Sequence, residues 1–405
     1  MKDNELYQYL LGLESPWTVK SVALDIQQQK VDVRAEHPQN SSWPCPKCGC
    51  QLPTYDHSPE RTWRHLDSCQ FKTYLHASIP RVNCQEHGVT QIDVPWAKPH
   101  SRFTLLFERL AIDVLKQCTV KGATSILRIS WDEAYGIMSR AVGRGLERKK
   151  AEPIPYLGID EKAIATGHKY MTLVYNLNQG IVEYVTEDRK QESLKRYYEQ
   201  LNQEQLKQIQ AVAMDMWEPF IKVTENYLGS GKIVIDRFHV MKHLNQAVDI
   251  VRKQENRELE KEGDSSLKGS RYLWLYSREN IPPTKLESFE KLIQKELKVG
   301  KAWAMKESFR ELWKQIDLNK GTEFFLNWWK WIYASEINPI KKAAKTVINH
   351  IDYILNYFFN QITNAVSEGL NSKIQKIQQM ACGYRNTENF KTAIYFHCGG
   401  LELYP

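Results

Sequence analysis

Three aspartates stand at the ends of apolar runs that have the length and composition of buried strands. The runs are YLGI before Asp160, AVAM before Asp215 and KIVI before Asp236. Charged side chains are rarely buried unless they are paired or bind a ligand. The sequence therefore predicts a sheet whose strand ends gather carboxylates.

The segment that carries these aspartates alternates between strand and helix patterns. Strands are predicted over 155–165, 168–177 and 181–186, with a hairpin turn at NQG between the last two. A helix at SLKRYYEQL then precedes two strands, AVAMDM and KIVIDRF, which the helix WEPFIKVTENYL separates. Three antiparallel strands followed by two helix-linked strands is the order of the ribonuclease-H-like fold, an α/β fold with a mixed five-stranded sheet. In that fold the middle of strand one lies beside the end of strand four, so Asp160 and Asp215 should be neighbours.

Neighbouring carboxylates predict a metal site, because they repel one another unless a cation neutralises them. A pair of Mg²⁺ ions about 4 Å apart does this, and it also activates a nucleophile and stabilises a leaving oxygen in phosphoryl transfer. Mg²⁺ and Mn²⁺ both prefer oxygen ligands. A third carboxylate must come from a later helix, and Glu368 in NAVSEGLNSKIQKIQQM is the best candidate. We predict Asp160, Asp215 and Glu368 as the catalytic residues and as the Mg²⁺ ligands.

Other residues near these acids leave alternatives open. Asp236 opens DRFH, so it could bind the metal in place of Asp215, or it could support the site together with His239. Glu161 should face the opposite side of its strand from the aspartate before it. Trp217 either stacks on an extruded base beside the metal site or packs in the core.

Two short cysteine motifs predict a zinc ribbon. CPKC supplies Cys45 and Cys48, and CQEH supplies Cys84 and His87. The two-residue gap lets each tight turn direct both side chains at one ion, and structural Zn²⁺ takes four such ligands in a tetrahedron. Cys50 competes with Cys48 as a ligand. Four protein ligands close the site, which predicts a structural role for one Zn²⁺.

Residues 119–150 predict a helix-turn-helix, with a turn at Ile129 and Ser130 as the N-cap of a helix from Trp131. The second helix would enter a DNA major groove, and the basic residues after it would bind phosphates. The predicted DNA contacts are Trp131, Tyr135, Ser139, Arg140, Arg144, Arg148, Lys149 and Lys150. The predicted apolar faces are Ala123, Ile126 and Leu127 on the first helix and Ala134, Ile137, Met138 and Ala141 on the second. The alternative is a plain helical hairpin with a solvated basic end.

The composition is that of an ordinary globular chain of several domains. Of 405 residues, 42% are hydrophobic and 25% are charged, and the net charge of +7 mildly favours a polyanionic partner. The sequence contains no run of eighteen or more apolar residues, so it predicts no membrane span. Its N-terminus lacks a signal-peptide pattern. We therefore expect a cytoplasmic protein, in which the eight cysteines are poor disulfide candidates.

Compositional changes along the chain predict five segments. They are a zinc-binding domain over 1–100, a helix-turn-helix domain over 101–152, a first part of the α/β core over 153–240, an all-helical insertion over 241–360, and C-terminal core helices with the glutamate over 361–405. The insertion holds six of the twelve tryptophans. Packing in a core is favoured over base stacking for them. The six are Trp274, Trp303, Trp313, Trp328, Trp329 and Trp331.

Together these motifs resemble the ISL-three family of bacterial insertion-sequence transposases over nearly the whole chain. The matching stretches are CPKC with CQEHG, VPWA, SRFT, SWDE, LGIDE, AMDMW, VIDRFHV, SEGLNSKIQ and GYRN. The resemblance implies a DDE transposase with a ribonuclease-H-like core and a helical insertion. It places the triad at Asp160, Asp215 and Glu368, and it matches Asp236 and His239 to a supporting signature after strand five.

One departure from the DDE pattern concerns contacts to DNA. Many such enzymes carry Lys or Arg seven residues after the glutamate, where this chain has Gln375. Lys373 and Lys376 lie close by and are predicted to contact DNA instead.

The resemblance also implies a function and partners. We expect binding to double-stranded DNA at terminal inverted repeats, Mg²⁺-dependent strand cleavage, and strand transfer into target DNA by a homodimer associated with the nucleoid. Two alternatives remain: a non-catalytic DNA-binding regulator, and a structure-specific nuclease without strand transfer.

Overall fold

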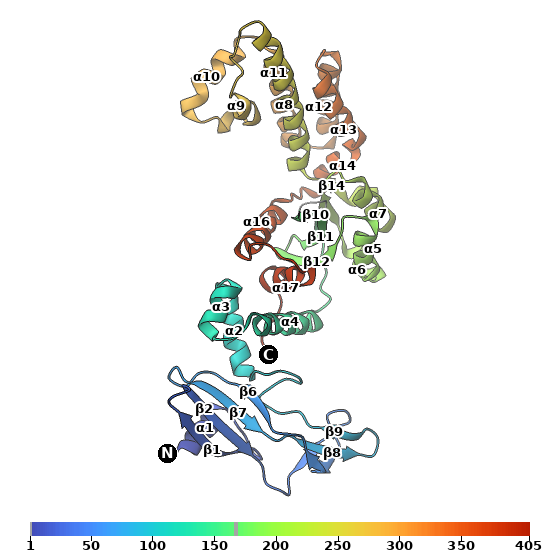
Figure 1. Cartoon of the computed structure of the whole chain (residues 1–405). Coiled ribbons are helices and arrows are strands. Elements are labelled where there is room, and N and C mark those ends of the chain that lie inside the picture. The colour runs from blue at the N-terminus through green and yellow to red at the C-terminus, as the bar shows by residue number, and fades with distance from the viewer. Residues whose placement is uncertain (1, 166–168) are drawn as a thin grey trace. The chain divides into compact units, whose positions relative to one another are not determined.

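The computed structural model describes residues 2–165 and 169–405, which form two compact units (Figure 1). Unit 1 contains the chain up to Lys149 together with Leu401–Pro405, and unit 2 contains Lys150–Gly400. The sequence-based division had assigned the last five residues to the core helices, whereas they belong to unit 1. The other domain boundaries stay a prediction.

Unit 1 begins with a helix and a four-stranded sheet of order β1-β2-β7-β6, in which β2 and β7 are parallel. A buried cluster that includes Trp17, Trp63 and Leu75 holds this part together. The bounds are α1 Asp3–Leu10, β1 Thr18–Asp25, β2 Lys30–Glu36, β6 Arg61–Arg64 and β7 Lys72–Ala77.

Two small sheets flank the cysteine motifs. One pairs β3 with β4, and the other has the order β5-β8-β9. Their strands have two to five residues, too few for such sheets to be stable alone. The bounds are β3 Ser42–Pro44, β4 Gln51–Pro53, β5 Asp56–His57, β8 Pro80–Cys84 and β9 Gly88–Gln91.

Three helices complete unit 1: α2 Leu105–Gln117, α3 Val120–Leu127 and α4 Trp131–Arg148. The predicted turn is confirmed, because Arg128 adopts a left-handed conformation with φ 55° and the Ser130 side chain accepts a hydrogen bond from the Glu133 backbone N–H. The Glu133 side chain accepts in return from the Ser130 N–H, which completes a capping box.

His65, which follows β6, connects the sheet to the start of α2. Its Nδ1 lies 2.9 Å from the Thr104 hydroxyl, and Thr104 is the N-cap of α2. Burial, aided by the charge of Arg64, lowers the pKa of His65 from 6.5 to about 4. The hydroxyl can donate to Nδ1 only while the imidazole is neutral.

This histidine predicts that unit 1 loses stability in mild acid. A histidine with a lowered pKa binds fewer protons when folded, so its contribution is complete above pH 6.5 and is lost as the pH falls toward 4. The loss is about 2 kcal/mol at pH 5 and about 3 kcal/mol at pH 4. Denaturant unfolding of the zinc-saturated protein at pH 7.5 and 5 should show a smaller pH effect in His65→Asn. An equal pH effect in wild type and variant would contradict the prediction.

Unit 2 contains a five-stranded mixed sheet of order β12-β11-β10-β13-β14. The first three strands in the chain pair antiparallel, and β13 and β14 then add in parallel to β10. The bounds are β10 Tyr156–Ala165, β11 Lys169–Asn176, β12 Ile181–Glu187, β13 Ala211–Met214 and β14 Ile233–Ile235. The predicted strand order is thereby confirmed. The predicted start of the second strand, His168, lies outside the described residues.

Helices cover the two faces of this sheet (Figure 1). One face buries Leu157, Val212 and Ile233 in a large apolar cluster with α5 and α7, and α16 contacts β10 while α17 contacts β12. The bounds are α5 Gln191–Glu199, α6 Gln203–Gln208, α7 Glu218–Leu228, α16 Ala365–Met380 and α17 Thr387–Cys398.

The predicted insertion is helical throughout its described secondary structure. Its first helix, α8 Arg237–Lys261, starts directly after β14 and contacts α11 and α13 (Figure 1). The others are α9 Arg271–Leu275, α10 Pro283–Ile293, α11 Lys298–Phe309, α12 Leu318–Ala334, α13 Asn338–Asn349, α14 Ile351–Leu355 and α15 Tyr357–Asn360. In the described part of the chain, no helix has the length and apolar character that spanning a membrane requires.

Candidate active site and metal centre

The three aspartates of the strand ends lie level with one another. Gly158 of β10 pairs with Ala213 of β13, and Ala213 pairs with Val234 of β14. Each aspartate, Asp160, Asp215 and Asp236, stands two residues beyond its paired position. Because the register is shared and the strands are parallel, the three carboxylates emerge side by side.

Side-chain alternation places all three on the same face of the sheet. Leu157 and Ile159 of β10 belong to the apolar cluster with α5 and α7. Asp160 is the next residue after Ile159, so its side chain points to the other face of the sheet, toward α16. Glu161 faces away from Asp160, as predicted, and its carboxylate instead lies 3.0 Å from Arg189.

His239, in the first turn of α8, lies among these carboxylates. Its Nδ1 is 3.3 Å from the Asp215 carboxylate. Burial opposes a charge on His239, but the hydrogen bond and charge of Asp215, with further contributions from Asp160 and Asp236, raise its pKa. Burial also acts on Asp215, but His239 outweighs it and lowers the pKa of Asp215. His239 therefore holds a proton more readily than a free imidazole does, and it lies within hydrogen-bond distance of the Asp215 carboxylate.

Asp160 and Asp236 have the opposite tendency. Burial raises the pKa of Asp160, and the charge of Asp215 adds to this effect. Burial likewise raises the pKa of Asp236, with a contribution from the charge of Glu368. Asp236 caps α8 by accepting from the Phe238 N–H, while its Oδ2 is buried without a hydrogen-bond partner among the described residues. A buried carboxylate oxygen without a partner fits a neighbouring cation or a proton.

Glu368 lies in the first turn of α16 and is exposed. Its charge acts on Asp236 across the strand ends. Helix α16 is fixed to β10 by hydrogen bonds two turns apart: Asn371 donates to Asp160, and Gln378 donates to the Ile164 carbonyl. The glutamate is thereby held at the same end of the sheet as the aspartates.

Gly158 lets the start of α16 approach the sheet. A Cβ at this position would lie 2.9 Å from the Asn364 side chain, 2.9 Å from Leu177, and closer still to the Ser367 hydroxyl. Asn364 and Ser367 are both buried.

We expect Gly158→Ala to displace the start of α16, and Glu368 with it. The overpacking should cost about 1–3 kcal/mol of stability, and the single-turnover rate of DNA cleavage should fall more than the affinity for DNA. Thermal unfolding and single-turnover cleavage measure the two effects. Gly231→Ala is the control, because its Cβ meets nothing within 4 Å. Equal behaviour of both variants would contradict the prediction.

Asn371 is a site residue that sequence reasoning missed. Its amide donates to Asp160 Oδ2 over 2.6 Å, and its carbonyl accepts from the Tyr175 hydroxyl over 2.6 Å. The tyrosine fixes the orientation of the amide, and the amide fixes the carboxylate. The only signal was that Asn371 follows Glu368 by three residues and so shares its helix face.

We expect Asn371→Ala to slow DNA cleavage by about 10–100-fold, the usual effect of removing a partner that orients a metal ligand. Binding of DNA should not change, because the residue acts through the Asp160 carboxylate. Tyr175→Phe should have a smaller effect in the same direction. Single-turnover cleavage and DNA binding are the measurements, and the exposed Gln379→Ala on α16 is the control. Unchanged cleavage in Asn371→Ala would contradict this role.

Gln375 occupies the place where a Lys or Arg was expected, and it binds a lysine. The Lys162 ammonium donates to the Gln375 side-chain oxygen. Lys162 shares the strand face of Asp160, so a positive charge stands two residues beyond this aspartate. Lys376 is exposed, and exposed Lys373 donates to the His397 carbonyl over 2.6 Å. Contact of these two lysines with DNA stays a prediction.

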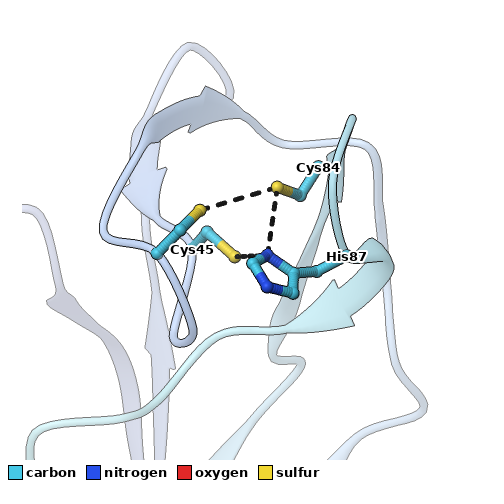
Figure 2. Close-up of side chains that lie close together, drawn as sticks. Cys45, Cys84 and His87 are labelled. Atoms are coloured by element: carbon cyan, nitrogen blue, oxygen red, sulfur yellow. Dashed lines mark hydrogen bonds between the residues drawn. The ribbon is translucent and has the colours of Figure 1, made fainter.

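The cysteine motifs form the tightest group of potential metal ligands in the described chain. The ligand atoms of Cys45, Cys48, Cys84 and His87 all lie within 4.8 Å of one another, and among the described residues no other group of three or more His, Cys, Asp or Glu does so. Figure 2 shows three of these side chains converging, with the His87 imidazole turned toward the sulfurs. The acidic residues of unit 2 thus form a more open arrangement.

The distances within this group fit a tetrahedral zinc ion. Cys48 Sγ lies 3.7 Å from Cys84 Sγ, and His87 Nδ1 lies 3.6 Å from Cys84 Sγ and 3.9 Å from Cys45 Sγ. Ligands around Zn²⁺ with bonds of about 2.3 Å to sulfur and about 2.0 Å to nitrogen are about 3.5–3.8 Å apart. Hydrogen bonds from the His87 backbone and side chain lower the pKa of Cys84 to about 6, which favours the thiolate that zinc binds. The competing residue Cys50 lies outside the group.

The helix-turn-helix prediction needs two corrections. Tyr135, expected to be partly exposed for DNA, is buried at 8% exposure, and its ring lies 4.5 Å from that of Trp131 at a tilt of 32°. Ile126, expected on the apolar face of α3, is 61% exposed, whereas Ala123 and Leu127 are buried as predicted. The predicted inward face of α4 is confirmed. It consists of Ala134, Ile137, Met138 and Ala141.

Two of the predicted DNA-binding arginines have a partner inside unit 1. The carboxylate of Glu108 on α2 is fully buried and pairs with Arg140 over 2.5 Å and with Arg144 over 3.2 Å. This network joins α2 to α4, and an unpaired charge at Glu108 would be costly. Ser139 and Arg148 remain exposed. DNA contact by these residues stays a prediction.

Trp217 is half-buried beside Asp215, and its indole N–H donates to the Arg189 carbonyl over 3.1 Å. Packing of the insertion tryptophans is confirmed for Trp274, Trp303 and Trp328, which are buried, while Trp331 is 45% exposed.

Comparison with known families gives three matches along the chain. A model of the DDE type for the ISL3 family, described as "Transposase", matches residues 157–394. A model described as the zinc-finger of transposase IS204/IS1001/IS1096/IS1165 matches residues 41–87. A third, the helix-turn-helix domain of transposase family ISL3, matches residues 92–142. The matched segments include the four cysteine-motif ligands and all the acidic site residues.

Curated relatives are similar over most of their length. The transposase for insertion sequence element IS1557 of Mycobacterium tuberculosis, from strains CDC 1551 / Oshkosh and ATCC 25618 / H37Rv, is 23% identical over 96% of this chain and 94% of its own. The transposase for insertion sequence element IS1001 of Bordetella parapertussis is 23% identical over 85% of this chain and 86% of its own.

Proposed function

This chain belongs to the ISL3 (ISL-three) family of insertion-sequence transposases, and we propose that it cleaves the ends of its element and joins them to target DNA in an Mg²⁺-dependent reaction. The observation that carries this proposal is the shared register of β10, β13 and β14, from which three carboxylates emerge side by side next to the helix of Glu368. Phosphoryl transfer needs such a concentration of oxygen ligands.

We assign the core to the ribonuclease-H-like fold. The strand order β12-β11-β10-β13-β14 and the strand directions match the order expected for that fold. Helices lie on both faces, and the acidic residues gather where β10 and β13 end.

The residues fit a divalent cation. Asp160, Asp215 and Glu368 would hold Mg²⁺, which when bound supplies activation of water and neutralises charge on the leaving oxygen. Asp236 Oδ2 has no hydrogen-bond partner in the part of the chain that the structure describes, so this aspartate would act as a further ligand or share a proton with a neighbour. His239 lies 3.3 Å from the Asp215 carboxylate, and when protonated it would neutralise this aspartate.

The reaction balances without a covalent intermediate on the protein. In the first step a water oxygen bonds to phosphorus, the bond from phosphorus to the 3′ oxygen breaks, and a 3′-hydroxyl is released. In the second step that hydroxyl attacks a target phosphodiester, and one phosphorus–oxygen bond replaces another. Asn371 and Tyr175 hold the Asp160 carboxylate in one orientation during both steps.

Unit 1 supplies recognition of the terminal inverted repeats in this proposal. Its zinc ribbon would hold one structural Zn²⁺, and α4 would read the major groove. Cutting two ends of one element requires two active sites, so we propose a homodimer that acts on nucleoid DNA in the cytoplasm.

Strand cleavage and strand transfer of end-labelled duplexes test the proposal. The wild type with Mg²⁺ should nick a duplex that carries the terminal repeat, and it should join a pre-cut end to a plasmid. Cleavage without joining would favour a structure-specific nuclease. Binding without either reaction would indicate a DNA-binding regulator. A duplex with a scrambled repeat is the control for sequence-specific binding.

A further inference from the structure

Arg189, in the segment between β12 and α5, is held between two aromatic rings. Its guanidinium carbon lies 4.0 Å from the centre of the Tyr170 ring and 4.7 Å from that of Trp217. One guanidinium nitrogen lies 3.0 Å from the Glu161 carboxylate. The Trp217 N–H fixes the Arg189 backbone. These contacts hold a long and normally mobile side chain in one position.

A cavity of about 420 Å³ opens at this group. Arg189, Tyr170, Trp217 and Pro219 contribute to its wall, together with Lys190. The volume falls within the range of about 300–1,000 Å³ typical of small-ligand sites. Two aromatic side chains and a proline give the wall apolar surface, and Asp188 and Gln191 also line it. Among the described residues the guanidinium gives one of its five donors to Glu161, and the Arg189 side chain is 31% exposed.

The cavity lies close to the proposed active site on the opposite face of the sheet. Glu161, which holds Arg189, directly follows Asp160, and Trp217 is two residues beyond Asp215. The charges of Asp160 and Asp215 both act on the Glu161 carboxyl. A nucleotide adjoining the scissile phosphate could reach the cavity only by leaving the base stack, because the end of the sheet lies between the two faces.

Charge in the cavity is balanced, which bears on the kind of ligand. Lys190 pairs with Asp188 over 3.0 Å, and Arg189 pairs with Glu161. A site for a multiply charged anion would carry an excess of cations. A nucleobase has two apolar faces and a polar edge, which matches ring walls beside a fixed guanidinium.

We propose that this cavity binds one extruded nucleotide of the transposon end beside the cleaved bond, with its base against Tyr170 and Trp217 and its edge on Arg189. The inference rests on the proposed function and names the part of its substrate that the cavity recognises. Burial of the base would keep the end strand unpaired at the active site and would hold the 3′-hydroxyl after cleavage.

Equilibrium binding in Ca²⁺, in place of Mg²⁺ to prevent cleavage, tests this proposal with three duplexes. They carry the terminal repeat and differ only at the nucleotide beside the cleaved bond, which is paired, mismatched or abasic. A mismatch lowers the cost of extrusion, and an abasic nucleotide removes the base. We expect the wild type to bind the mismatched end about tenfold more tightly than the other two, the usual effect of stacking one base.

Arg189→Gln and Trp217→Ala should remove this preference, because each weakens binding of the mismatched end. Arg189→Lys keeps the charge but not the planar fork, and it should also lose the preference. Arg196→Gln and Arg196→Lys are matched controls, because this arginine is exposed on α5. A cooperative thermal unfolding transition shows that a variant is folded.

The possible outcomes distinguish a failure of the nucleotide-binding proposal from a failure of the proposed transposase function. Equal affinity of the wild type for all three ends, with normal cleavage in Mg²⁺, would contradict nucleotide binding in the cavity and leave the transposase proposal intact. Equal affinity for the mismatched and abasic ends would overturn base binding. Failure of the wild type to cut or bind any of the ends would overturn the proposed function and this inference with it.

Discussion

Asp160→Asn and Asp215→Asn should each abolish DNA cleavage, with a loss of about 10³-fold or more in the single-turnover rate, equivalent to at least about 4 kcal/mol of transition-state stabilisation. Asparagine preserves the size of the side chain and removes the charge that attracts the cation. Affinity for the terminal-repeat duplex should stay within about twofold, because recognition is assigned to unit 1. Cleavage of a labelled duplex in Mg²⁺, alongside binding in Ca²⁺, measures both quantities.

Asp236→Asn tests whether Asp215 or Asp236 is the second carboxylate ligand of the metal. Asp236 caps α8 through the Phe238 N–H, and an asparagine can still accept this hydrogen bond. We therefore expect Asp236→Asn to retain measurable cleavage. Asp352→Asn, at an exposed position on α14, controls for the loss of one negative charge. A variant set in which Asp236→Asn is inactive and Asp215→Asn cuts normally would move the metal site to Asp236 and His239.

Loss of zinc should have the second large effect. Structural Zn²⁺ contributes about 10–16 kcal/mol of apparent binding free energy in zinc-finger peptides, and the two small sheets of unit 1 have few residues with which to replace it. Cys84→Ser should reduce the zinc content from one ion per chain to nearly none. It should also lower the affinity for the terminal repeat by about 100-fold or more, since an unfolded ribbon loses its contacts with DNA.

Metal analysis, DNA binding and limited proteolysis check this prediction. Cleavage at residues 41–91 by protease should increase in Cys84→Ser, while unit 2 stays resistant, because its core is separate from unit 1. Cys50→Ser and Cys69→Ser are matched controls at exposed cysteines outside the ligand group. A zinc content of one per chain in Cys84→Ser, or its loss in Cys50→Ser, would contradict the ligand assignment.

Much of the site follows from short-range patterns. The two-residue spacing in CPKC and CQEH determines which atoms can reach one ion, and the structure brings those four together. Apolar runs that end in aspartate predicted three strand ends, and the strand order then made them neighbours. The capping box at Ser130 is encoded within four residues. In each case the pattern itself lies within one turn or one strand, whereas the fold brings the two cysteine motifs and the three strand ends together.

Tertiary structure alone decided the features that depend on a distant partner. Asn371 acts on Asp160 across more than 200 residues, and its role depends on the direction in which α16 crosses β10. From the sequence, Arg140 and Arg144 are expected to be solvated and free to bind DNA. The structure pairs both with the buried Glu108 on another helix.

The sequence also did not determine whether residues at the edge of an apolar helix face are buried or exposed. Tyr135 and Ile126 both stand at the margin of an apolar stripe, where a small rotation of the helix exchanges core for solvent. Periodicity locates the centre of such a stripe, but the neighbouring helices determine its width. The role of Arg189 was not predicted because its neighbours are distant in the sequence. The two aromatic rings and the carboxylate that contact it come from three separate segments of the chain, which only the folded sheet brings together.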